Sequence, residues 1–170
     1  MKRPVISAAL AVAAVALAAW AAFYFRDAAR ILRATEALAR MVSKAGSENP
    51  IAGAARAEQF AGFFVERPAL ALDFMPAVPD GRRELGALVF QVRSRADEIK
   101  VQLFDPNVRM APDHRTAELE VTARGTVRAS DYSDSVLREF HLSWVKTPDG
   151  WKISRAETVE AIRHPLAQPQ

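Results

Sequence analysis

Residues 140–153 read Phe-His-Leu-Ser-Trp-Val-Lys-Thr-Pro-Asp-Gly-Trp-Lys-Ile, and they decide the fold class of this chain. The apolar residues Phe140, Leu142 and Trp144 fall on one face of an extended segment, and a Thr-Pro-Asp-Gly turn then leads into Trp151. Alternation with a period of two residues, bounded by such a turn, is typical of a half-buried antiparallel hairpin. The sequence therefore predicts that its C-terminal part forms an antiparallel sheet.

Two further strands are predicted ahead of this hairpin. Between Thr116 and Arg128 apolar residues alternate with polar ones, and the apolar set is Ala117, Leu119, Val121, Ala123 and Val127. The segment from Ile99 to Met110 is also extended in character, but Asp105-Pro106 interrupts it. Because proline cannot donate a hydrogen bond to a neighbouring strand, we expect a bulge or bend there.

Three helices are predicted before the strands, at Asp27–Ala45, from Ile51 to about Val65, and from Arg82 to about Glu98. The third has apolar residues at helical spacing, namely Leu85, Leu88, Val89, Val92 and Ala96. A short apolar segment, Ala69–Met75, is a candidate strand at the sheet edge. Helices followed by strands indicate an α+β fold, with three N-terminal helices packed on a strongly curved antiparallel sheet.

An uncharged segment of 22 residues, Pro4–Phe25, precedes the first of these helices. As a helix it would span roughly 33 Å, which is enough for a hydrocarbon core of about 30 Å. Lys2 and Arg3 in front of it predict an N-in orientation in a bacterial inner membrane, with the domain in the periplasm. Ala19-Trp20-Ala21 also satisfies the small-x-small rule, so a cleaved signal peptide and a secreted domain remain an alternative.

The sequence therefore predicts a signal anchor (residues 1–26), one domain (27–164) and a flexible tail (165–170). Of the formal charge of +3, Lys2, Arg3 and Arg26 flank the anchor, which leaves 20 basic and 20 acidic residues. A neutral domain without a basic stripe predicts no nucleic-acid partner. The chain has no cysteine, and no two of its three histidines have ligand spacing, so we predict no metal site and no cofactor.

The order of elements resembles the nuclear transport factor 2-like superfamily, also called SnoaL-like or cystatin-like. The resemblance covers about residues 27–164. The segments that carry it are the helix ending at Glu98, Ile99–Pro106, the strand Thr116–Val127, and Leu142–Ile153 with its Gly-Trp-Lys-Ile closing strand. It implies a cone-shaped fold with a pocket between the concave sheet and the helices. This fold hosts isomerases, cyclases, dehydratases, ligand binders and scaffolds, so it does not specify an activity.

The active-site patterns of that superfamily do not transfer to this chain. Ketosteroid-isomerase-like chemistry needs a carboxylate base and tyrosine donors, but Tyr24 lies in the apolar segment and Tyr132 in a predicted loop. We therefore predict no catalytic residues and favour a non-catalytic interaction or scaffold module. A small-ligand-binding domain is the first alternative. A SnoaL-like isomerase, cyclase or hydrolase using Asp73 or Glu157 as base is the second.

Four residues are candidates for ligand binding. Pairing Lys146 with Trp151 across the hairpin turn places Arg138, Arg155 and Glu157 on its otherwise apolar face, and Asp73 lies near the edge segment. Arginines there would favour a small anionic ligand, although a rim salt-bridge network or an apolar ligand is compatible with the same pattern. The outer face of the sheet, which includes His141, is the predicted surface for a protein partner or a second copy.

Overall fold

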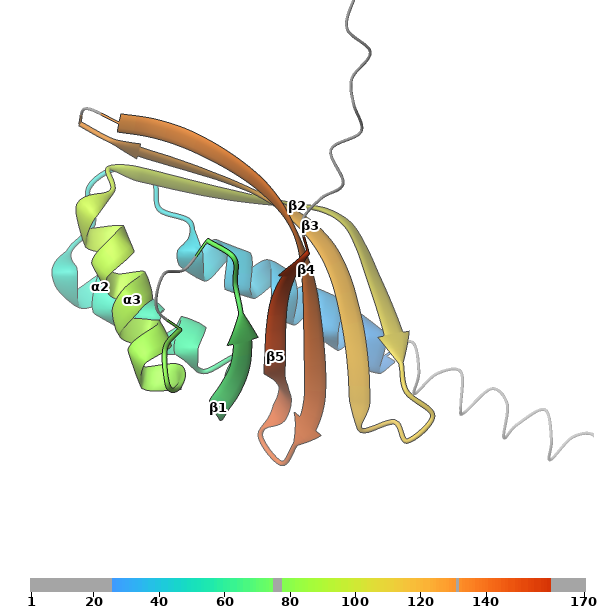
Figure 1. Ribbon diagram of the computed structural model, residues 1–170. Helices are drawn as coiled ribbons and strands as arrows, with labels where there is room; N and C mark the ends of the chain where they lie inside the picture. Colours follow the sequence, from blue (N-terminus) through green and yellow to red (C-terminus); the bar gives the residue numbers. More distant parts are fainter. Residues whose placement is uncertain (1–25, 75–77, 131, 160–170) are drawn as a thin grey trace, which may run out of the picture.

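The computed structural model describes residues 26–74, 78–130 and 132–159, in which three helices pack on one curved five-stranded sheet (Figure 1). In chain order the elements are a helix at residues 26–42, α2 (Pro50–Ala61), β1 (Phe64–Ala71), α3 (Arg82–Arg95), β2 (Glu98–Met110), β3 (Thr116–Ala129), β4 (Tyr132–Thr147) and β5 (Gly150–Val159). The predicted anchor segment 4–25 and tail 165–170 lie outside the described residues. In the described ranges, no helix combines the length and apolar character needed to cross a bilayer.

The sheet is mixed, which corrects the prediction of an antiparallel sheet. Its strand order is β1-β5-β4-β3-β2, and only β1 runs parallel to its neighbour, β5. The second helix ends earlier than predicted, at Gly62, because the aromatic and β-branched residues that follow favour a strand. The chain thus leaves α2 beside Ile153, near the start of β5, and both strands run from there in the same direction.

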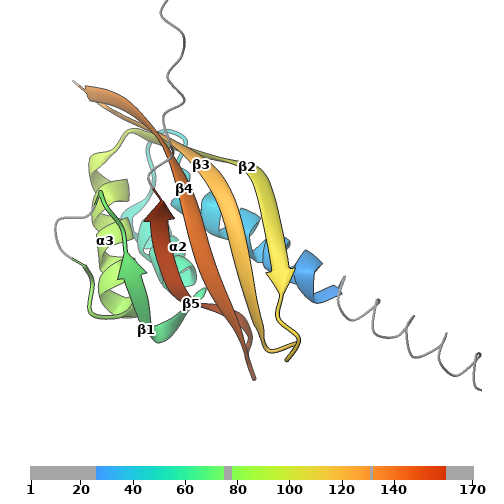
Figure 2. The same ribbon diagram turned by 45° about the vertical axis from the view of Figure 1, so that its right-hand side comes forward.

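The concave face of the sheet is filled by side chains from the helices. Figures 1 and 2 show the sheet curling around the helix at 26–42 and α2, with α3 beside β1. The fully buried side chains Trp144, Leu119 and Ile153 of the sheet share one core with Ile31 of the first helix. Trp144 and Trp151 are both buried, as the sequence predicted for the hairpin.

A buried arginine ties the ends of two helices together. Arg93 of α3 is only 1% exposed, and its Nη1 donates to the carbonyls of Met41, Val42 and Ser43 at 2.7–2.8 Å. Its Nη2 also donates to the Glu48 carboxylate, at 2.6 and 2.7 Å. These carbonyls lie at the C-terminus of the first helix, where backbone acceptors lack helical partners and positive charge is favoured. Arg93 therefore caps a helix other than its own.

Lys44 makes the reciprocal contact. It follows the first helix, and its Nζ donates to the carbonyls of Arg93 and Ala96 at 2.9 and 2.6 Å, at the C-terminus of α3. The predicted apolar face of α3 is consequently rotated. Val92, which belongs to the predicted apolar period of this helix, is 43% exposed, and the adjacent Arg93 faces inward. Hydrophobic periodicity assigns apolar residues to the buried face of a helix. It takes no account of backbone carbonyls that need a hydrogen-bond donor, and so it favoured Val92 over Arg93 for the buried position.

Two bulges shape the long strands. In β2 the pairing with β3 shifts between Phe104 and Asn107, which confirms the irregularity predicted at Asp105-Pro106; Asp105 has φ 51°. In β5 the predicted register holds for Lys146 with Trp151 and for Trp144 with Ile153. It then shifts by one residue, because Ser154 has no opposite residue in β4 and its hydroxyl donates to the Ser143 carbonyl at 3.1 Å. Beyond Ser154 the side chains of β5 therefore exchange faces.

A buried carboxylate links the first helix to the β4–β5 hairpin. Asp27 accepts from Lys146 Nζ at 2.7 Å and from Arg30 Nη1 at 3.1 Å. The Trp151 indole nitrogen also faces it, although without a hydrogen bond of ordinary geometry. Burial alone would raise the pKa of Asp27, but the Lys146 hydrogen bond and charge and the Arg30 contact outweigh it and hold this pKa below its ordinary value.

We expect Asp27→Asn to lower the free energy of unfolding at pH 7 by about 1–3 kcal/mol, since it weakens a hydrogen-bonded ion pair. A depressed pKa in the folded state stabilises the protein above the unfolded-state pKa of about 4, and this contribution is lost as the pH falls further. Urea denaturation of both proteins at several pH values from 7 to 3 should show the difference between them shrinking below about pH 4. A difference that does not depend on pH would contradict this role.

Candidate functional site

The strongest polar cluster at the end of the concave face joins Asp73, Arg138 and Thr158, which we call the Asp73 cluster. The Thr158 hydroxyl donates to Asp73 Oδ1 at 2.8 Å, and the Asp73 backbone N–H donates to Thr158 Oγ1 at 2.9 Å. Arg138 Nε lies 3.3 Å from Asp73 Oδ2. The parallel pairing of β1 with β5 and the antiparallel pairing of β5 with β4 bring these three residues to the same end of the sheet.

Two aromatic rings adjoin this cluster. Phe140 is opposite Thr158 across the β4–β5 pair, and its ring meets that of Phe74 edge-on with centroids 6.3 Å apart. Phe74 is half exposed. A carboxylate, a guanidinium and a hydroxyl beside exposed aromatic surface form a site that can hold a small molecule with one polar end and one apolar part.

Two of the four predicted ligand residues therefore come together, and two do not. Arg155 and Glu157 lie on the outer face of the sheet, because the Ser154 bulge reverses their direction. There Arg155 Nε donates to Glu157 Oε1 at 2.7 Å, while Ala156 and Thr158 face the concave side. The predicted cluster of Arg138, Arg155 and Glu157 is thus wrong as a geometric unit, and Thr158 is the member that sequence reasoning missed.

A single extra residue in β5 caused this error. Regular alternation would place Glu157 inward, and nothing in the sequence Ile-Ser-Arg-Ala-Glu marks Ser154 as a bulge. The small apolar residue Ala156 is the one available signal, since it suits the buried face better than either charged neighbour.

The Asp73 cluster is accessible rather than enclosed. The side chains of Arg138 and Asp73 are 38% and 44% exposed. The Arg138 Nε atom is itself buried and makes no hydrogen bond of ordinary geometry, while Nη1 donates to the Leu137 carbonyl at 3.1 Å. The guanidinium therefore keeps donor capacity for a further acceptor, such as a ligand oxygen.

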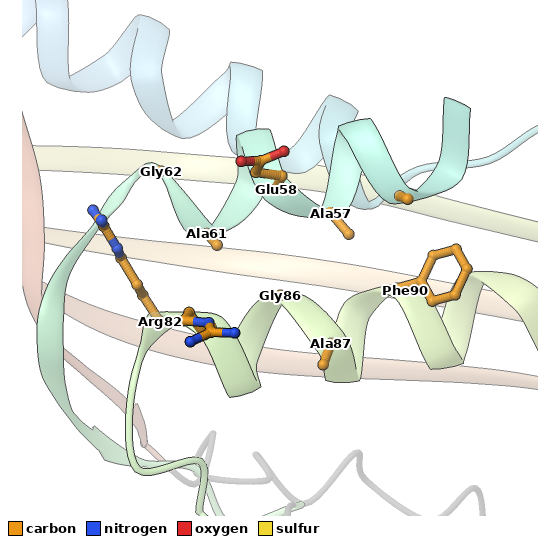
Figure 3. A pocket seen from close by; sticks show the side chains of 10 residues that line it. Ala57, Glu58, Ala61, Gly62, Arg82, Gly86, Ala87 and Phe90 are labelled. Carbon is orange, nitrogen blue, oxygen red and sulfur yellow. The ribbon is translucent and has the colours of Figure 1, made fainter. Parts of the chain in front are cut away.

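A separate hollow lies between α2 and α3. It has a volume of about 620 Å³, and Figure 3 shows Arg82 at one end and Phe90 at the other. Small residues line the bottom of this groove, where the two helices approach each other closely. Gly86 permits this approach, because a Cβ atom on Gly86 would lie only 3.2 Å from the Cβ atom of Ala61. The groove is on the helical side of the molecule, whereas the superfamily resemblance implied a pocket between the sheet and the helices.

The three buried polar or charged residues of the described core have structural partners, whereas the buried indole nitrogens of Trp144 and Trp151 make no hydrogen bond of ordinary geometry. Thr35 Oγ1 donates to the Ile31 carbonyl at 2.9 Å, and the other two are Asp27 and Arg93, described above. Among the described residues no three histidine, aspartate or glutamate side chains are arranged to hold a metal ion.

The outer face of the sheet combines ion pairs with exposed apolar residues. Arg109 bonds Glu120 at 2.6 Å, Ser143 bonds Glu118 at 3.0 Å, and His141 lies 3.4 Å from Glu139. The exposed apolar side chains on this face are those of Phe104, Leu137 and Val159, and the Arg124 guanidinium lies 5.4 Å above the Phe104 ring. His141 faces outward, as predicted.

Comparison with known structures supports the fold. A proposed scytalone dehydratase from Novosphingobium aromaticivorans superimposes with a TM-score of 0.66 at 13% identity, over 88% of this chain and 99% of that one. A proposed aromatic ring hydroxylase from the same organism has a TM-score of 0.66 at 17% identity, over 79% and 88%. ActVI-ORFA from Streptomyces coelicolor has a TM-score of 0.57 at 12% identity, over 77% and 94%. At such identities the likeness concerns the fold alone.

Sequence comparison identifies the family. No curated protein matches the chain. The family model for the SnoaL-like domain, however, matches residues 30–157, which include every described strand almost in full and most of the first helix. This match covers well over half of the chain. The chain therefore belongs to the SnoaL-like domain family.

Proposed function

We propose that this protein is a membrane-anchored extracytoplasmic interaction module, in which the SnoaL-like domain serves as a non-catalytic scaffold. The observation that carries the proposal is the occupation of the concave face by the protein's own core. Trp144, Leu142 and Leu119 of the sheet pack with Ile31 and Phe60 of the helices, on the face where this fold otherwise provides a ligand chamber. A face filled in this way suits a rigid support.

The outer sheet face is the proposed partner surface. Its ion pairs and exposed apolar side chains offer both polar contacts and area to bury, as protein interfaces do. The apolar ends of this surface, Phe104 on β2 and Val159 on β5, flank the charged centre formed by β3 and β4. A second protein or a second copy of this chain would bind there.

The anchor is proposed from the sequence. The apolar run Pro4–Phe25 would hold the domain at the inner membrane, and Lys2 and Arg3 would keep the N-terminus in the cytoplasm. Cleavage after Ala21 would instead release a periplasmic domain, with the same interaction surface.

A second candidate function is the binding of a small molecule at the Asp73 cluster. The unused donor capacity of Arg138 and the exposed ring of Phe74 favour it. The structural neighbours proposed as a dehydratase and a hydroxylase extend this candidate to catalysis, with Asp73 as base. Glu157, the other predicted base, lies on the outer face paired with Arg155, which leaves Asp73 as the carboxylate for that chemistry.

The experiment that tests the proposal places a photo-crosslinking residue at Phe104 or His141 of the full chain in its native membrane. Both positions should yield a discrete adduct, with a partner or a second copy. The same residue at Ile51, which is 80% exposed on α2, should yield none. Equal labelling at all three positions would contradict a specific surface.

The same membrane preparation distinguishes the scaffold proposal from the second candidate function, small-molecule binding at the Asp73 cluster. A small molecule that co-purifies with the chain and is lost in Arg138→Gln, without adducts at the outer face, would replace the scaffold proposal with the ligand-binding one.

A further inference from the structure

In the part of the chain that the structure describes, β4 extends beyond β5 and leaves one strand edge open. The pairing of β4 with β5 ends at Glu139 opposite Val159, yet β4 begins seven residues earlier, at Tyr132. Figures 1 and 2 both show the β3–β4 hairpin projecting past the ends of β1 and β5. Within the described residues, no strand pairs with this side of β4 between Tyr132 and Arg138.

The groups that point to this edge can be identified from the register. In an antiparallel sheet, the N–H and C=O groups of alternate residues point to the same neighbouring strand. The Lys146 N–H donates to the Arg115 carbonyl on the β3 side, so the odd-numbered residues of β4 point their backbone groups toward β5. Beyond Glu139 these residues are Leu137, Ser135 and Ser133. Two of these groups are held by neighbouring side chains. Asp134 Oδ1 accepts from the Ser135 N–H at 2.8 Å, and Arg138 Nη1 donates to the Leu137 carbonyl at 3.1 Å. These two side chains provide the hydrogen bonds that a neighbouring strand would otherwise make to the Ser135 N–H and the Leu137 carbonyl.

The other open edges of the sheet carry features that block strand addition. β2 has the bulge at Asp105 together with Pro106, and Lys44 forms an antiparallel bridge with its second residue, Ile99. β1 contains Pro68, which lacks an N–H. Such devices keep natural sheet edges from pairing with another chain. Residues 132–138 of β4 contain no proline, lysine or bulge.

We propose that a second copy of this chain pairs with β4 along Asp134–Arg138, antiparallel and centred on Val136. The segment Asp-Ser-Val-Leu-Arg is self-complementary in this register. Val136 meets Val136 of the other copy, and each Asp134 meets the Arg138 of the other copy on the same face. Ser135 and Leu137 form the hydrogen-bonded pairs, and the two-fold axis makes the contact isologous.

The exposed side chains and the existing contacts suit this pairing. Val136 and Leu137 are 37% and 45% exposed, which is unusual for strand valine and leucine. On pairing, the Ser135 N–H and the Leu137 carbonyl satisfy each other across the axis. Asp134 Oδ1 and Arg138 Nη1, which now bind these groups, then form the two ion pairs between copies, while Arg138 Nε keeps its contact with Asp73 and Asp134 Oδ2 keeps the hydrogen bond from Tyr132.

The contact is short, because β5 already occupies the position next to Glu139. It is distinct from the outer sheet face and does not depend on the membrane anchor. Confinement of both copies to one membrane would raise their effective concentration and favour it.

Disulfide trapping tests the pairing in the full chain, which has no cysteine of its own. Residues at a non-hydrogen-bonded antiparallel pair have Cβ atoms about 4.5–5.5 Å apart, close to the distance that a disulfide requires. Under mild oxidation in membranes, the Val136→Cys chain should form covalent dimers. Since pairing holds the two thiols at roughly millimolar effective concentration, trapping should be about a thousandfold faster than for micromolar collisions.

Ile51→Cys is the matched control, because Ile51 is more exposed than Val136 and lies on α2. Equal trapping rates for the two variants would overturn the proposal. So would faster trapping through Phe104→Cys, which would indicate association through the outer face. A monomeric chain whose Ser135 and Leu137 amides are nevertheless protected from hydrogen exchange would also overturn it, since the chain itself would then cover the edge.

Charge exchange gives a second, independent readout in the Val136→Cys background. Asp134→Arg or Arg138→Asp alone brings like charges together across the axis, and trapping should fall about tenfold for each, given the usual size of cross-strand charge effects. Mixing the two variants restores both opposite-charge pairs, so disulfides between the two different chains should form at nearly the original rate. Failure of the mixture to recover, with both variants folded by circular dichroism, would contradict the register.

Discussion

Replacing Arg93 by methionine should lower the free energy of unfolding by about 3–5 kcal/mol, the largest loss expected for a polar residue in this chain. The substitution leaves three carbonyls at the end of the first helix without their donor and leaves Glu48 without its bidentate partner. Buried groups that lose their partner carry the full cost of desolvation, and methionine keeps the volume of the side chain without restoring any hydrogen bond. Chemical denaturation followed by circular dichroism measures the change.

Arg95→Met is the control, because Arg95 is an exposed arginine on the last turn of the same helix. Its loss should change stability by less than about 0.5 kcal/mol, as for surface positions generally. Similar losses for the two variants would mean that Arg93 acts through helix charge rather than through the carbonyls that it caps.

Replacing Trp144 by alanine should cost about 3–5 kcal/mol, because it removes the largest fully buried side chain and leaves a cavity in the core. The indole packs at the centre of the concave face with Ile31, Leu119 and Ile153, so the surrounding residues have little freedom to close the gap. The measurement is again the free energy of unfolding by denaturant, with Val145→Ala as control. Val145 is the next residue along β4 and faces outward, and its truncation should cost less than about 1 kcal/mol.

A loss for Trp144→Ala near that of Val145→Ala would show that the two faces of β4 are assigned incorrectly. It would also weaken the proposed function, which depends on a concave face filled by the protein itself.

The sequence predictions were accurate for features that depend on residues close together in the chain. The helix break before Pro50, the irregularity at Asp105-Pro106 and the turn before Gly150 were all predicted, because each depends on the conformational limits of residues at that point. The burial of Trp144 and Trp151 was predicted from alternation. These features are local, and they were sufficient to indicate the α+β class.

The candidate site was predicted only in part. Asp73 and Arg138 were both chosen, but as members of separate groups, and their contact depends on the parallel arrangement of β1 and β5. Arg155 and Glu157 were misplaced by one unpaired residue, Ser154, since a shift of one position reverses every later side chain.

The sequence by itself determined most of the helix and strand segments and the apolar face of the curved sheet, because propensity, alternation and turn chemistry act between near neighbours in the chain. Only the tertiary structure decided that β1 lies parallel to β5, that Arg93 is buried among the carbonyls of another helix, and that β4 has an open edge among the described residues. Each of these depends on groups that are distant in sequence, and their energies exist only once the elements have packed.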